Sequence, residues 1–358
     1  MSVNDSLFMR AARREPVERT PVWFMRQAGR ILPEYRAVRE HHTLVEICRQ
    51  PELCADVTMQ PIDRLGVDAA ILFSDIMTPL LGVGIDLQIV DGVGPVIAQP
   101  IRADSDLARL RPLEPEQDLP YVLESIRILV QRLGDRRPLI GFAGAPFTLA
   151  AYLVEGKPSR DFVKVKSMMF GAPELWHALM DRLTAITIRY LTAQAKAGAH
   201  ALQLFDSWVG ALAPQDYATF VQPYSRRIFA ALAPLGVPCI HFGTGTATLL
   251  PLMKDDGAPI IGVDWHVPLD EAWRTVGYDK GVQGNLDPAV LFAPESYVRE
   301  RVGDVLRRTG GRAGHLFNLG HGLHPQTPVA TVQRAVEYVH ELSARDAQRD
   351  ERLAEIGA

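Results

Sequence analysis

The sequence has few cysteines, little net charge and no uninterrupted apolar run suited to a membrane helix. Its three cysteines, Cys48, Cys54 and Cys239, are too few and too scattered for a disulfide framework. This favours a reducing, cytoplasmic compartment. A net charge of −4 makes no general case for binding nucleic acid. Residues 228–253 contain no Asp, Glu, Lys or Arg, but three prolines and three glycines interrupt them, so we expect no membrane anchor.

Targeting and linker segments are not expected either. The first twenty residues have no apolar signal core, and their Asp and Glu residues disfavour a transit peptide. No linker-like stretch divides the chain, and 47% hydrophobic with 22% charged residues is ordinary for a globular protein with a real core. We therefore expect one domain over residues 1–345, followed by a charged and frayed tail over residues 346–358.

One short pattern recurs along the chain: a helix-like segment, a glycine, and an apolar run that ends in glycine or a polar residue. Glycine ends the helix in a left-handed conformation, and the apolar run is typical of a strand buried on both faces. Residues 17–25, VERTPVWFM, are a weaker candidate because Pro21 suits only the start of a strand. Together the units predict a single-domain α/β protein, a (β/α)8 TIM barrel. The seven stronger strand candidates are in AAILFSD, PLIGFAG, HALQLFDS, PCIHFG, PIIGVDW, KGVQGN and GHLFNLG.

The sequence also predicts two features of the segments that connect the strands. Residues 82–101, GVGIDLQIVDGVGPVIAQPI, alternate on either side of Asp91-Gly92, a pair typical of hairpin turns. We therefore expect a β-hairpin inserted after the second strand. Later, Gly243, Asp264 and Asn285 follow one another at equal intervals that leave room for only one short helix each.

The stretch Met25–Arg30, MRQAGR, follows the first strand candidate and carries two arginines four residues apart. On a helix their like charges would repel by a few tenths of a kcal/mol, and Gly29 would weaken that helix further. The arginines are therefore either solvated surface residues or ligands of an anion. Catalytic groups of such barrels lie at the carboxyl ends of the strands. The other polar residues expected there are Ser74, Asp75, Tyr152, Asp206, Ser207, Asn318 and His321.

Three further patterns are weaker. His321 and His324 lack an evident third ligand at suitable spacing, so we expect no metal site. The GTGT stretch, Gly243–Thr246, could cradle a phosphate, but a turn at the barrel rim explains it equally well. Asp206 ends a strand, where such residues often brace a loop, and we leave it as structural.

In this combination the chain resembles the uroporphyrinogen decarboxylase family of bacterial type. The resemblance runs from about Leu7 to Leu342. Any one of the shared motifs would be weak, but MRQAGR, FSDI and NLGHG together are a strong signal. The motifs occur in the family's order: PVWFMRQAGRILPEYR, LFSDI, GAPFTLAAYLVEG, LFDSW, HFGTGT, GVDW, QGNLDP and NLGHG.

The resemblance implies a cytoplasmic, homodimeric carboxy-lyase of porphyrin and haem biosynthesis that uses no metal or organic cofactor. Its substrate would be uroporphyrinogen III, a cyclic tetrapyrrole with eight carboxylates around four pyrrole N–H groups. Four acetate arms would become methyls, giving coproporphyrinogen III and four CO2. Arg26 and Arg30 would bind carboxylates, because the guanidinium fork suits that task better than lysine does.

The resemblance also assigns roles to other residues. Asp75 would be the central carboxylate that faces the pyrrole nitrogens, and with Arg26 and Tyr152 it forms the expected catalytic set. The proton donor stays open: the family points to Arg26, but a guanidinium with a pKa above ~12 is a poor acid, and water or a substrate carboxyl is the alternative. The expected substrate-binding residues are Arg26, Gln27, Ala28, Gly29, Arg30, Asp75, Tyr152, Ser207 and His321.

Two other functions fit parts of the sequence. Related barrels that transfer methyl groups from corrinoids hold zinc with a His-x-Cys pair and a later cysteine. Here Phe242 precedes Gly243, and no cysteine follows Cys239. A tetrapyrrole-binding protein without turnover could keep the arginines, but it would not require a central acid, so Asp75 favours an enzyme.

Overall fold

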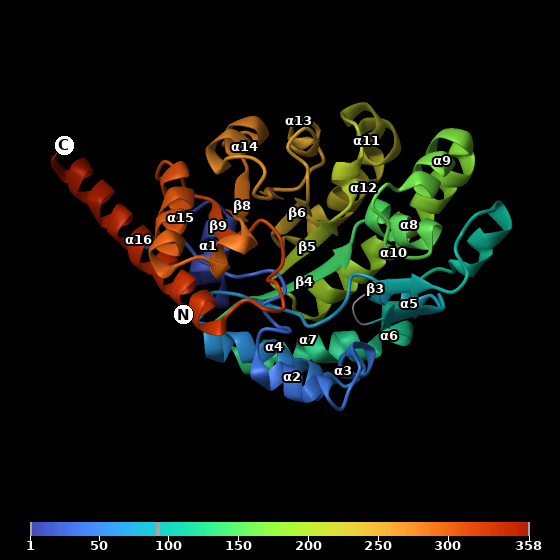
Figure 1. The fold of residues 1–358 in the computed structure, drawn as a ribbon, viewed down its shortest axis with the longest axis horizontal. Helices are drawn as coiled ribbons and strands as arrows, with labels where there is room; N and C mark the ends of the chain where they lie inside the picture. The colour runs from blue at the N-terminus through green and yellow to red at the C-terminus, as the bar shows by residue number, and fades with distance from the viewer. Residues whose placement is uncertain (1, 91–93, 357–358) are drawn as a thin grey trace.

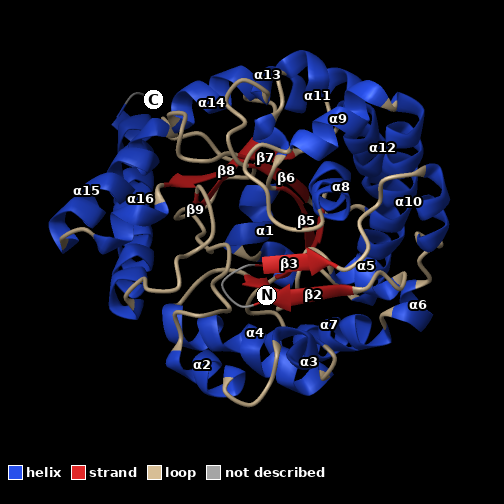
Figure 2. Ribbon diagram, turned by 45° about the vertical axis from the view of Figure 1, so that its right-hand side comes forward, coloured by secondary structure: helices blue, strands red, loops and turns tan. Residues whose placement is uncertain are grey.

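A curled sheet of seven parallel strands organises the computed structural model, which describes residues 2–90 and 94–356. Figure 2 shows these strands inside a surrounding layer of helices. Each of the seven stronger strand candidates forms one of them, in unbroken spatial order along the sheet. The strands are β1 (Ala70–Ile71), β4 (Leu139–Gly144), β5 (Ala201–Asp206), β6 (Cys239–Gly243), β7 (Ile260–Gly262), β8 (Gly281–Leu286) and β9 (His315–Leu319).

Helices connect successive strands and cover the outside of the sheet (Figure 1). Gly66 and Gly198 end the helices before β1 and β5 with φ of 72° and 114°, a conformation that residues with a Cβ rarely adopt. The main connecting helices are α4 (Pro51–Leu65), α7 (Pro120–Leu133), α10 (Pro173–Ala197), α12 (Gln222–Leu232), α14 (Leu269–Val276), α15 (Glu295–Arg308) and α16 (Val329–Ile356).

The remaining helices are short, and several lie in loops at the carboxyl end of the sheet. The two equal intervals noted in the sequence each hold one short helix, α13 and α14, as predicted. The short helices are α1 (Leu7–Ala12), α2 (Pro33–Arg39), α3 (Leu44–Cys48), α5 (Thr78–Gly82), α6 (Pro115–Asp118), α8 (Pro146–Glu155), α9 (Val163–Gly171), α11 (Pro214–Phe220) and α13 (Leu250–Met253).

The segment before MRQAGR lies between β9 and the chain that enters β1. Phe317 N–H donates to Pro21 O (2.9 Å) and Trp23 N–H donates to Phe317 O (3.3 Å). On the other side, Asp68 N–H donates to Val22 O (2.7 Å). Instead of the strand expected over residues 17–25, there is a single parallel bridge between Val22 and Phe317. Pro21 accounts for part of the difference, because it has no N–H to extend a ladder.

Strands β2 (Leu87–Val90) and β3 (Gly94–Ile97) form a separate antiparallel sheet. The Asp91-Gly92 turn expected between them lies outside the described residues. This small sheet is fixed to helix α8, since Ile97 N–H donates to Gly156 O (2.8 Å). A second bond, from Ile101 N–H to Leu153 O (2.8 Å), holds the chain just after β3 to the same helix.

At the carboxyl end, the backbone of α16 is helical to Ile356 and so continues past residue 345, where we expected the tail to begin. The division of the chain at residue 345 stays a prediction. Within residues 2–90 and 94–356, no helix combines the length and the apolar character needed to cross a membrane.

A chain of buried polar side chains fills the interior of the curled sheet. Trp23 Nε1–H donates to Gln283 Oε1 (3.1 Å), and Gln283 Nε2 donates to Gln203 Oε1 (3.0 Å). All three side chains have at most 1% of their surface exposed. Buried amides tolerate this environment because they are hydrogen-bonded to one another. The interior is therefore packed at this level, and open space begins only above it.

A buried carboxylate fastens the segment that precedes MRQAGR. Asp68, only 3% exposed, accepts a bond from Val22 N–H (3.0 Å) and one from Arg19 Nη2 (3.2 Å), and its Oδ2 lies 2.7 Å from His340 Nε2. Burial alone would raise the pKa of Asp68, but the bond to His340 and the charges of His340 and Arg19 lower it overall. One carboxylate thus joins the N-terminal segment, the approach to β1 and helix α16.

We predict that Asp68→Asn lowers the free energy of unfolding by about 1.5–3 kcal/mol, the scale for losing hydrogen bonds to a charged group. Asp68 contributes this stability above its ordinary pKa of 3.8 and loses it as the pH falls through its lower folded-state pKa. Denaturant titrations of both proteins at neutral pH and below about pH 4 measure this. The difference in the free energy of unfolding between wild type and Asp68→Asn should be smaller at the lower pH.

The matched control is Glu124→Gln, which removes an exposed ion pair to Arg127 (3.0 Å). This substitution should lower the free energy of unfolding by less than ~0.5 kcal/mol. Equal effects of the two variants would contradict the role given to Asp68.

Candidate active site

A pocket opens at the carboxyl ends of the strands and encloses about 330 Å³, within the range of small-molecule sites, roughly 300–1,000 Å³. Loops from both halves of the chain contribute to it, together with Ile89, Gly94 and Pro95 of the small antiparallel sheet. Eight of the nine residues expected to bind substrate line this pocket: Arg26, Ala28, Gly29, Arg30, Asp75, Tyr152, Ser207 and His321.

The MRQAGR stretch is a turn rather than a helix. Arg26 has a φ of 63°, a left-handed conformation that is uncommon for a residue with a side chain. Such a conformation persists only where the surroundings enforce it. Here Met25 N–H donates to Asn318 Oδ1 (3.2 Å), and Leu323 N–H donates to Met25 O (3.0 Å). Strand β9 and the loop after it therefore hold the backbone N–H and C=O of Met25, the residue before Arg26.

Gln27 is the one expected binding residue whose side chain does not line the pocket. It is fully buried; its Oε1 accepts from Phe24 N–H (2.9 Å) and its Nε2 donates to Ala69 O (2.9 Å). Both functional atoms of the carboxamide are thus used inside the protein, where they tie the turn to the start of β1. The sequence motif gave no sign that Gln27 points inward while its neighbours point into the pocket.

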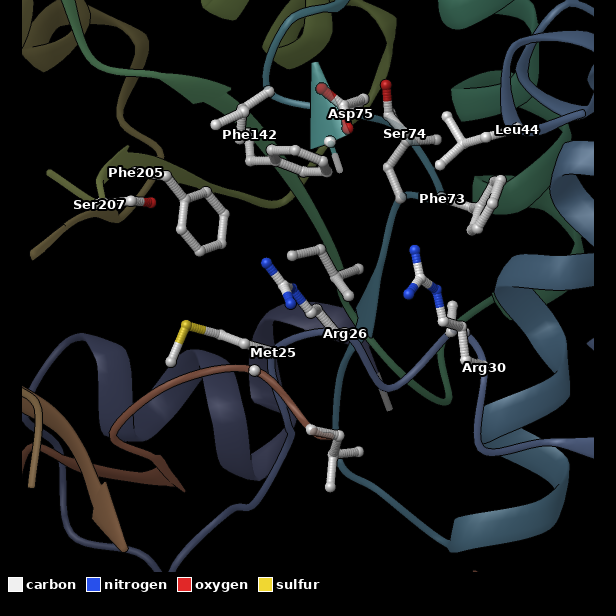
Figure 3. A pocket seen from close by; sticks show the side chains of 18 of the residues that line it. Met25, Arg26, Arg30, Leu44, Phe73, Ser74, Asp75, Phe142, Phe205 and Ser207 are labelled. Carbon is white, nitrogen blue, oxygen red and sulfur yellow. The ribbon is translucent and has the colours of Figure 1, made fainter. Parts of the chain in front are cut away.

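The two arginines project into the same space, as Figure 3 shows, and Asp75 and Ser74 lie across it. Both side chains keep access to solvent within the pocket. Among the described residues, neither guanidinium forms a hydrogen bond or an ion pair. Burial among pocket atoms and the charge of Arg30 lower the pKa of Arg26, against the opposing effects of Asp75 and Tyr152. The pocket therefore presents uncompensated positive charge to whatever enters it.

Asp75 is held by the turn in which it lies. Its Oδ1 accepts from Met77 N–H (2.8 Å), and the Thr78 hydroxyl lies 3.4 Å from the Asp75 N–H and 3.0 Å from the Ser74 hydroxyl. Burial raises the pKa of Asp75, while the Met77 N–H and the charge of Arg26 oppose the rise. One carboxylate oxygen is thus fixed, and in the described structure the other has no hydrogen-bond partner. It is available to a donor on a ligand.

Tyr152, on helix α8, contributes a largely buried phenol at the pocket wall. Its ring packs edge-on against Trp208 with centroids 6.1 Å apart. Burial, and to a smaller extent the charge of Asp75, raises the pKa of Tyr152, so the phenol keeps its proton at neutral pH and can donate a hydrogen bond. Ser207 lies on the loop just before Trp208 and lines the same pocket.

Asp206, which we left as structural, lies outside the pocket lining and is fully buried. It accepts a bond from the Thr148 hydroxyl (3.0 Å), one turn before Tyr152 on α8. Its other oxygen lies 3.7 Å from Nε2 of His241, whose Nδ1 is 3.3 Å from Asp256. Burial opposes charge on His241, but the two carboxylates raise its pKa to about 9. These contacts brace α8 and the ends of β5 and β6.

His321 and His324 have different surroundings. His321 lines the pocket and packs edge-on against Trp265, with ring centroids 6.5 Å apart. Burial first, and then the charge of Arg26, lower the pKa of His321 to about 4, so it is neutral at physiological pH. His324 is exposed and does not line the pocket. In the part of the chain that the structure describes, no group of three or more His, Cys, Asp or Glu is placed to hold a metal ion.

Aromatic walls complete the pocket, and the analysis of the sequence did not identify them. Phe205 packs edge-on against Phe142 (centroids 5.4 Å) and against Phe242 (5.9 Å), and the three phenylalanines come from adjacent strands. Figure 3 shows Phe142 and Phe205 beside the arginines. Their positions were a usable signal: Phe205 and Phe242 are paired on neighbouring strands, and Phe142 lies two residues before the partner of Phe205, so all three share one face.

Fold and site together define an α/β protein of barrel-like type whose pocket holds two arginines without ion-pair partners among the described residues and one carboxylate. Comparisons with known proteins make this specific. The model of the family "Uroporphyrinogen decarboxylase (URO-D)" matches residues 4–342. The chain belongs to the uroporphyrinogen decarboxylase family.

Curated relatives agree over nearly the full length. A protein of Streptomyces griseus named uroporphyrinogen decarboxylase is 59% identical over 96% of this chain and 94% of its own. Proteins of the same name from Thermobifida fusca and Thermus thermophilus are 58% and 56% identical over 96% of this chain, and over 95% and 99% of their own.

Solved structures share the fold with low sequence identity. A methyltransferase from Methanosarcina mazei superposes with a TM-score of 0.75 at 20% identity, covering 93% of this chain and 98% of its own. A B12-independent methionine synthase from Shewanella gives a TM-score of 0.57 at 12% identity, covering 87% of this chain and 91% of its own. At these identities the likeness concerns the fold alone.

We predict that Arg26→Ala and Arg30→Ala each cost about 2–5 kcal/mol in substrate binding or transition-state stabilisation, the scale for removing one partner of a desolvated charge pair. Both variants should stay folded, since neither guanidinium has a partner among the described residues. Steady-state kinetics and thermal unfolding measure the two effects.

Arg274→Ala is the control, because Arg274 is an exposed arginine of α14 outside the pocket. Its kcat/KM and its thermal unfolding should equal those of wild type. If the Arg26 or Arg30 variant unfolds, or keeps an undiminished kcat/KM, the assignment of that residue to substrate binding is wrong.

Proposed function

We propose that this enzyme decarboxylates the four acetate side chains of uroporphyrinogen III, giving coproporphyrinogen III and four CO2 in porphyrin and haem biosynthesis. Membership of the family supports this activity. Within the structure, one observation carries it: the half-buried carboxylate of Asp75 faces a pocket that also holds Arg26 and Arg30 without anionic partners (Figure 3).

The substrate and this pocket have complementary charge distributions. Uroporphyrinogen carries eight carboxylates on its periphery and four pyrrole N–H donors at its centre. Arg26 and Arg30 supply charged donors for the periphery, and the guanidinium fork fits a carboxylate with two parallel hydrogen bonds. The free oxygen of Asp75 supplies the acceptor for the centre. The phenylalanine walls offer apolar surface to the faces of the pyrrole rings.

Decarboxylation of an acetate arm requires a group that accepts the electron pair of the breaking C–C bond. Protonation of a pyrrole ring carbon gives a cation that accepts the electron pair of the breaking C–C bond as CO2 leaves. The exocyclic carbon then takes a proton to become a methyl group, and the ring carbon returns its own proton. One proton thus replaces each CO2, and the pyrrole itself acts as the electron sink that other decarboxylases obtain from a cofactor.

Asp75 stabilises this reaction through its charge. A fixed anion beside the pyrrole nitrogens interacts more strongly with the ring cation than with the neutral ring, so it lowers the barrier rather than only the energy of the bound substrate. The bond from Met77 N–H fixes the carboxylate before the substrate arrives. Arg26 binds a peripheral carboxylate of the substrate, and the protonated phenol of Tyr152 donates to the substrate. Ser207 and the neutral His321 complete the hydrogen bonding.

Other features of the proposal rest on the family and on backbone contacts. We propose that Pro21–Trp23 serves as the eighth strand, since it bonds to β9 and to the chain entering β1. The fold would then be a closed single-domain (β/α)8 barrel with the β2–β3 hairpin inserted after its second strand. We also propose that the enzyme works as a cytoplasmic homodimer, on family membership alone, and that Gln27 positions the arginine turn.

The activity is tested by incubating the purified protein with uroporphyrinogen III prepared without oxygen and identifying the products. Coproporphyrinogen III and four equivalents of CO2 are expected. Binding of the tetrapyrrole without release of CO2 would instead indicate a binding protein.

We predict that the reaction proceeds at an unchanged rate after exhaustive chelation, since the proposed mechanism takes its electron sink from the substrate. Initial rates before and after treatment with a chelator test this. An activity that chelation abolishes and a divalent metal restores would show that the mechanism lacks a component.

Asp75 allows a sharper prediction. Asp75→Asn keeps the shape and one acceptor oxygen but removes the charge, so kcat should fall by about 10²–10³, the scale for one preorganised electrostatic group. Asp75→Glu keeps the charge but displaces it by ~1 Å, which can cost about 10²-fold. The expected order of kcat is wild type, then Glu, then Asn, with smaller changes in substrate binding.

Asp161→Asn is the control, because Asp161 is exposed and outside the pocket. It should match wild type. A near-normal kcat for Asp75→Asn would make Asp75 a docking acceptor or a turn residue, and the ring cation would need another anion.

A further inference from the structure

Gly322, in the NLGHG motif after β9, lies directly against the side chain of Arg26. A Cβ built on Gly322 would lie 2.7 Å from Arg26 Cγ and 2.9 Å from Arg26 Nε, with Cδ closer still. Real Cβ atoms essentially never lie within 3.0 Å of a non-bonded heavy atom. Any residue other than glycine at position 322 must therefore displace the stem of Arg26.

The conflict lies along the middle of the arginine side chain, at Cγ, Cδ and Nε. The φ of 63° at Arg26 sets the direction in which its Cβ leaves the backbone, and Asn318 and Leu323 fix the adjacent Met25 peptide groups. The backbone therefore cannot turn away from Gly322. The side chain can avoid an added methyl group only by changing rotamer, and that would move the guanidinium from its place in the pocket.

Gly322 does not need the conformational freedom of glycine for its own backbone. Its φ is outside the left-handed range, whereas Gly310, Gly311 and Gly314 earlier in the same region have positive φ values. The three heavy atoms nearest to a Cβ built on Gly322 all belong to Arg26. Arg26 is therefore the first obstacle that a larger residue at this position would meet.

We propose that Gly322 is a positioning residue that sets the rotamer of Arg26, and thereby the place of the substrate carboxylate that Arg26 binds. The end of β9 and the loop after it then act on the arginine twice, since Asn318 and Leu323 hold the backbone of the preceding Met25 and Gly322 leaves space for the side chain of Arg26. This inference rests on the proposed function, in which Arg26 holds a carboxylate of the tetrapyrrole.

The test is a double-mutant cycle with Gly322→Ala and Arg26→Ala. Gly322→Ala should lower kcat/KM by about 10–100-fold. In the Arg26→Ala background the same substitution should change kcat/KM by less than ~3-fold, because the side chain it displaces is gone. Residues that act through one another couple in this way, whereas independent effects multiply.

A second readout does not depend on turnover. Binding of coproporphyrin III, a stable oxidised relative of the expected product, can be followed by its fluorescence for all four proteins of the cycle. Gly322→Ala should weaken binding in the wild-type background and leave it unchanged in the Arg26→Ala background. Gly171→Ala is the control, since a Cβ at Gly171 meets nothing within 4 Å and its φ is not positive.

Each outcome decides one question. Wild-type kcat/KM and binding in Gly322→Ala, or multiplicative effects in the double variant, would overturn the positioning role. If Gly322→Ala does not fold, restored folding in the double variant would support the clash with Arg26, and continued misfolding would refute it. A wild-type protein that binds coproporphyrin through Arg26 but releases no CO2 would instead refute the proposed function and leave the role of Gly322 intact.

Discussion

The backbone of Met25, held between Asn318 and Leu323, is the constraint on which the rest of the site depends. It joins the arginine turn to β9 and the loop after it, almost 300 residues further along the chain, and supports the uncommon backbone conformation of Arg26. Gln27 secures the other side of the turn against the start of β1. Two arginines can then point into one pocket without forming the helix that their charges would oppose.

This arrangement separates two tasks that a multiply charged substrate imposes. In the proposed function, the arginines bind the carboxylates of the ligand and Asp75 accepts from the donors at its centre. Asp75 lies among protein atoms that raise its pKa, while Arg26 opposes the rise. An anion in such surroundings interacts strongly with a nearby developing cation, because little solvent reorganises around it. The positive charge of Arg26 thus favours the ionised form of the Asp75 carboxylate.

Much of the fold and part of the site could be predicted from the sequence, because both follow from local patterns. Apolar runs after glycines marked seven strands, and the carboxyl ends of parallel strands brought Asp75, Ser207 and His321 to one pocket. Features that depend on long-range packing could not be predicted from local sequence patterns. The inward-pointing carboxamide of Gln27 and the contact of Gly322 with Arg26 depend on segments that meet only in the folded chain. The Asp91-Gly92 turn that the sequence predicts lies outside the described residues.

The central claim is that Asp75 faces the pyrrole nitrogens while Arg26 and Arg30 hold carboxylates. A crystal structure of the enzyme with coproporphyrinogen III, grown without oxygen, measures this directly. The account predicts pyrrole nitrogens within about 3 Å of the Asp75 carboxylate, the distance of a hydrogen bond, and carboxylates of the ligand on both guanidinium groups. A ligand bound with its nitrogens away from Asp75, or with its carboxylates on other residues, would contradict the account.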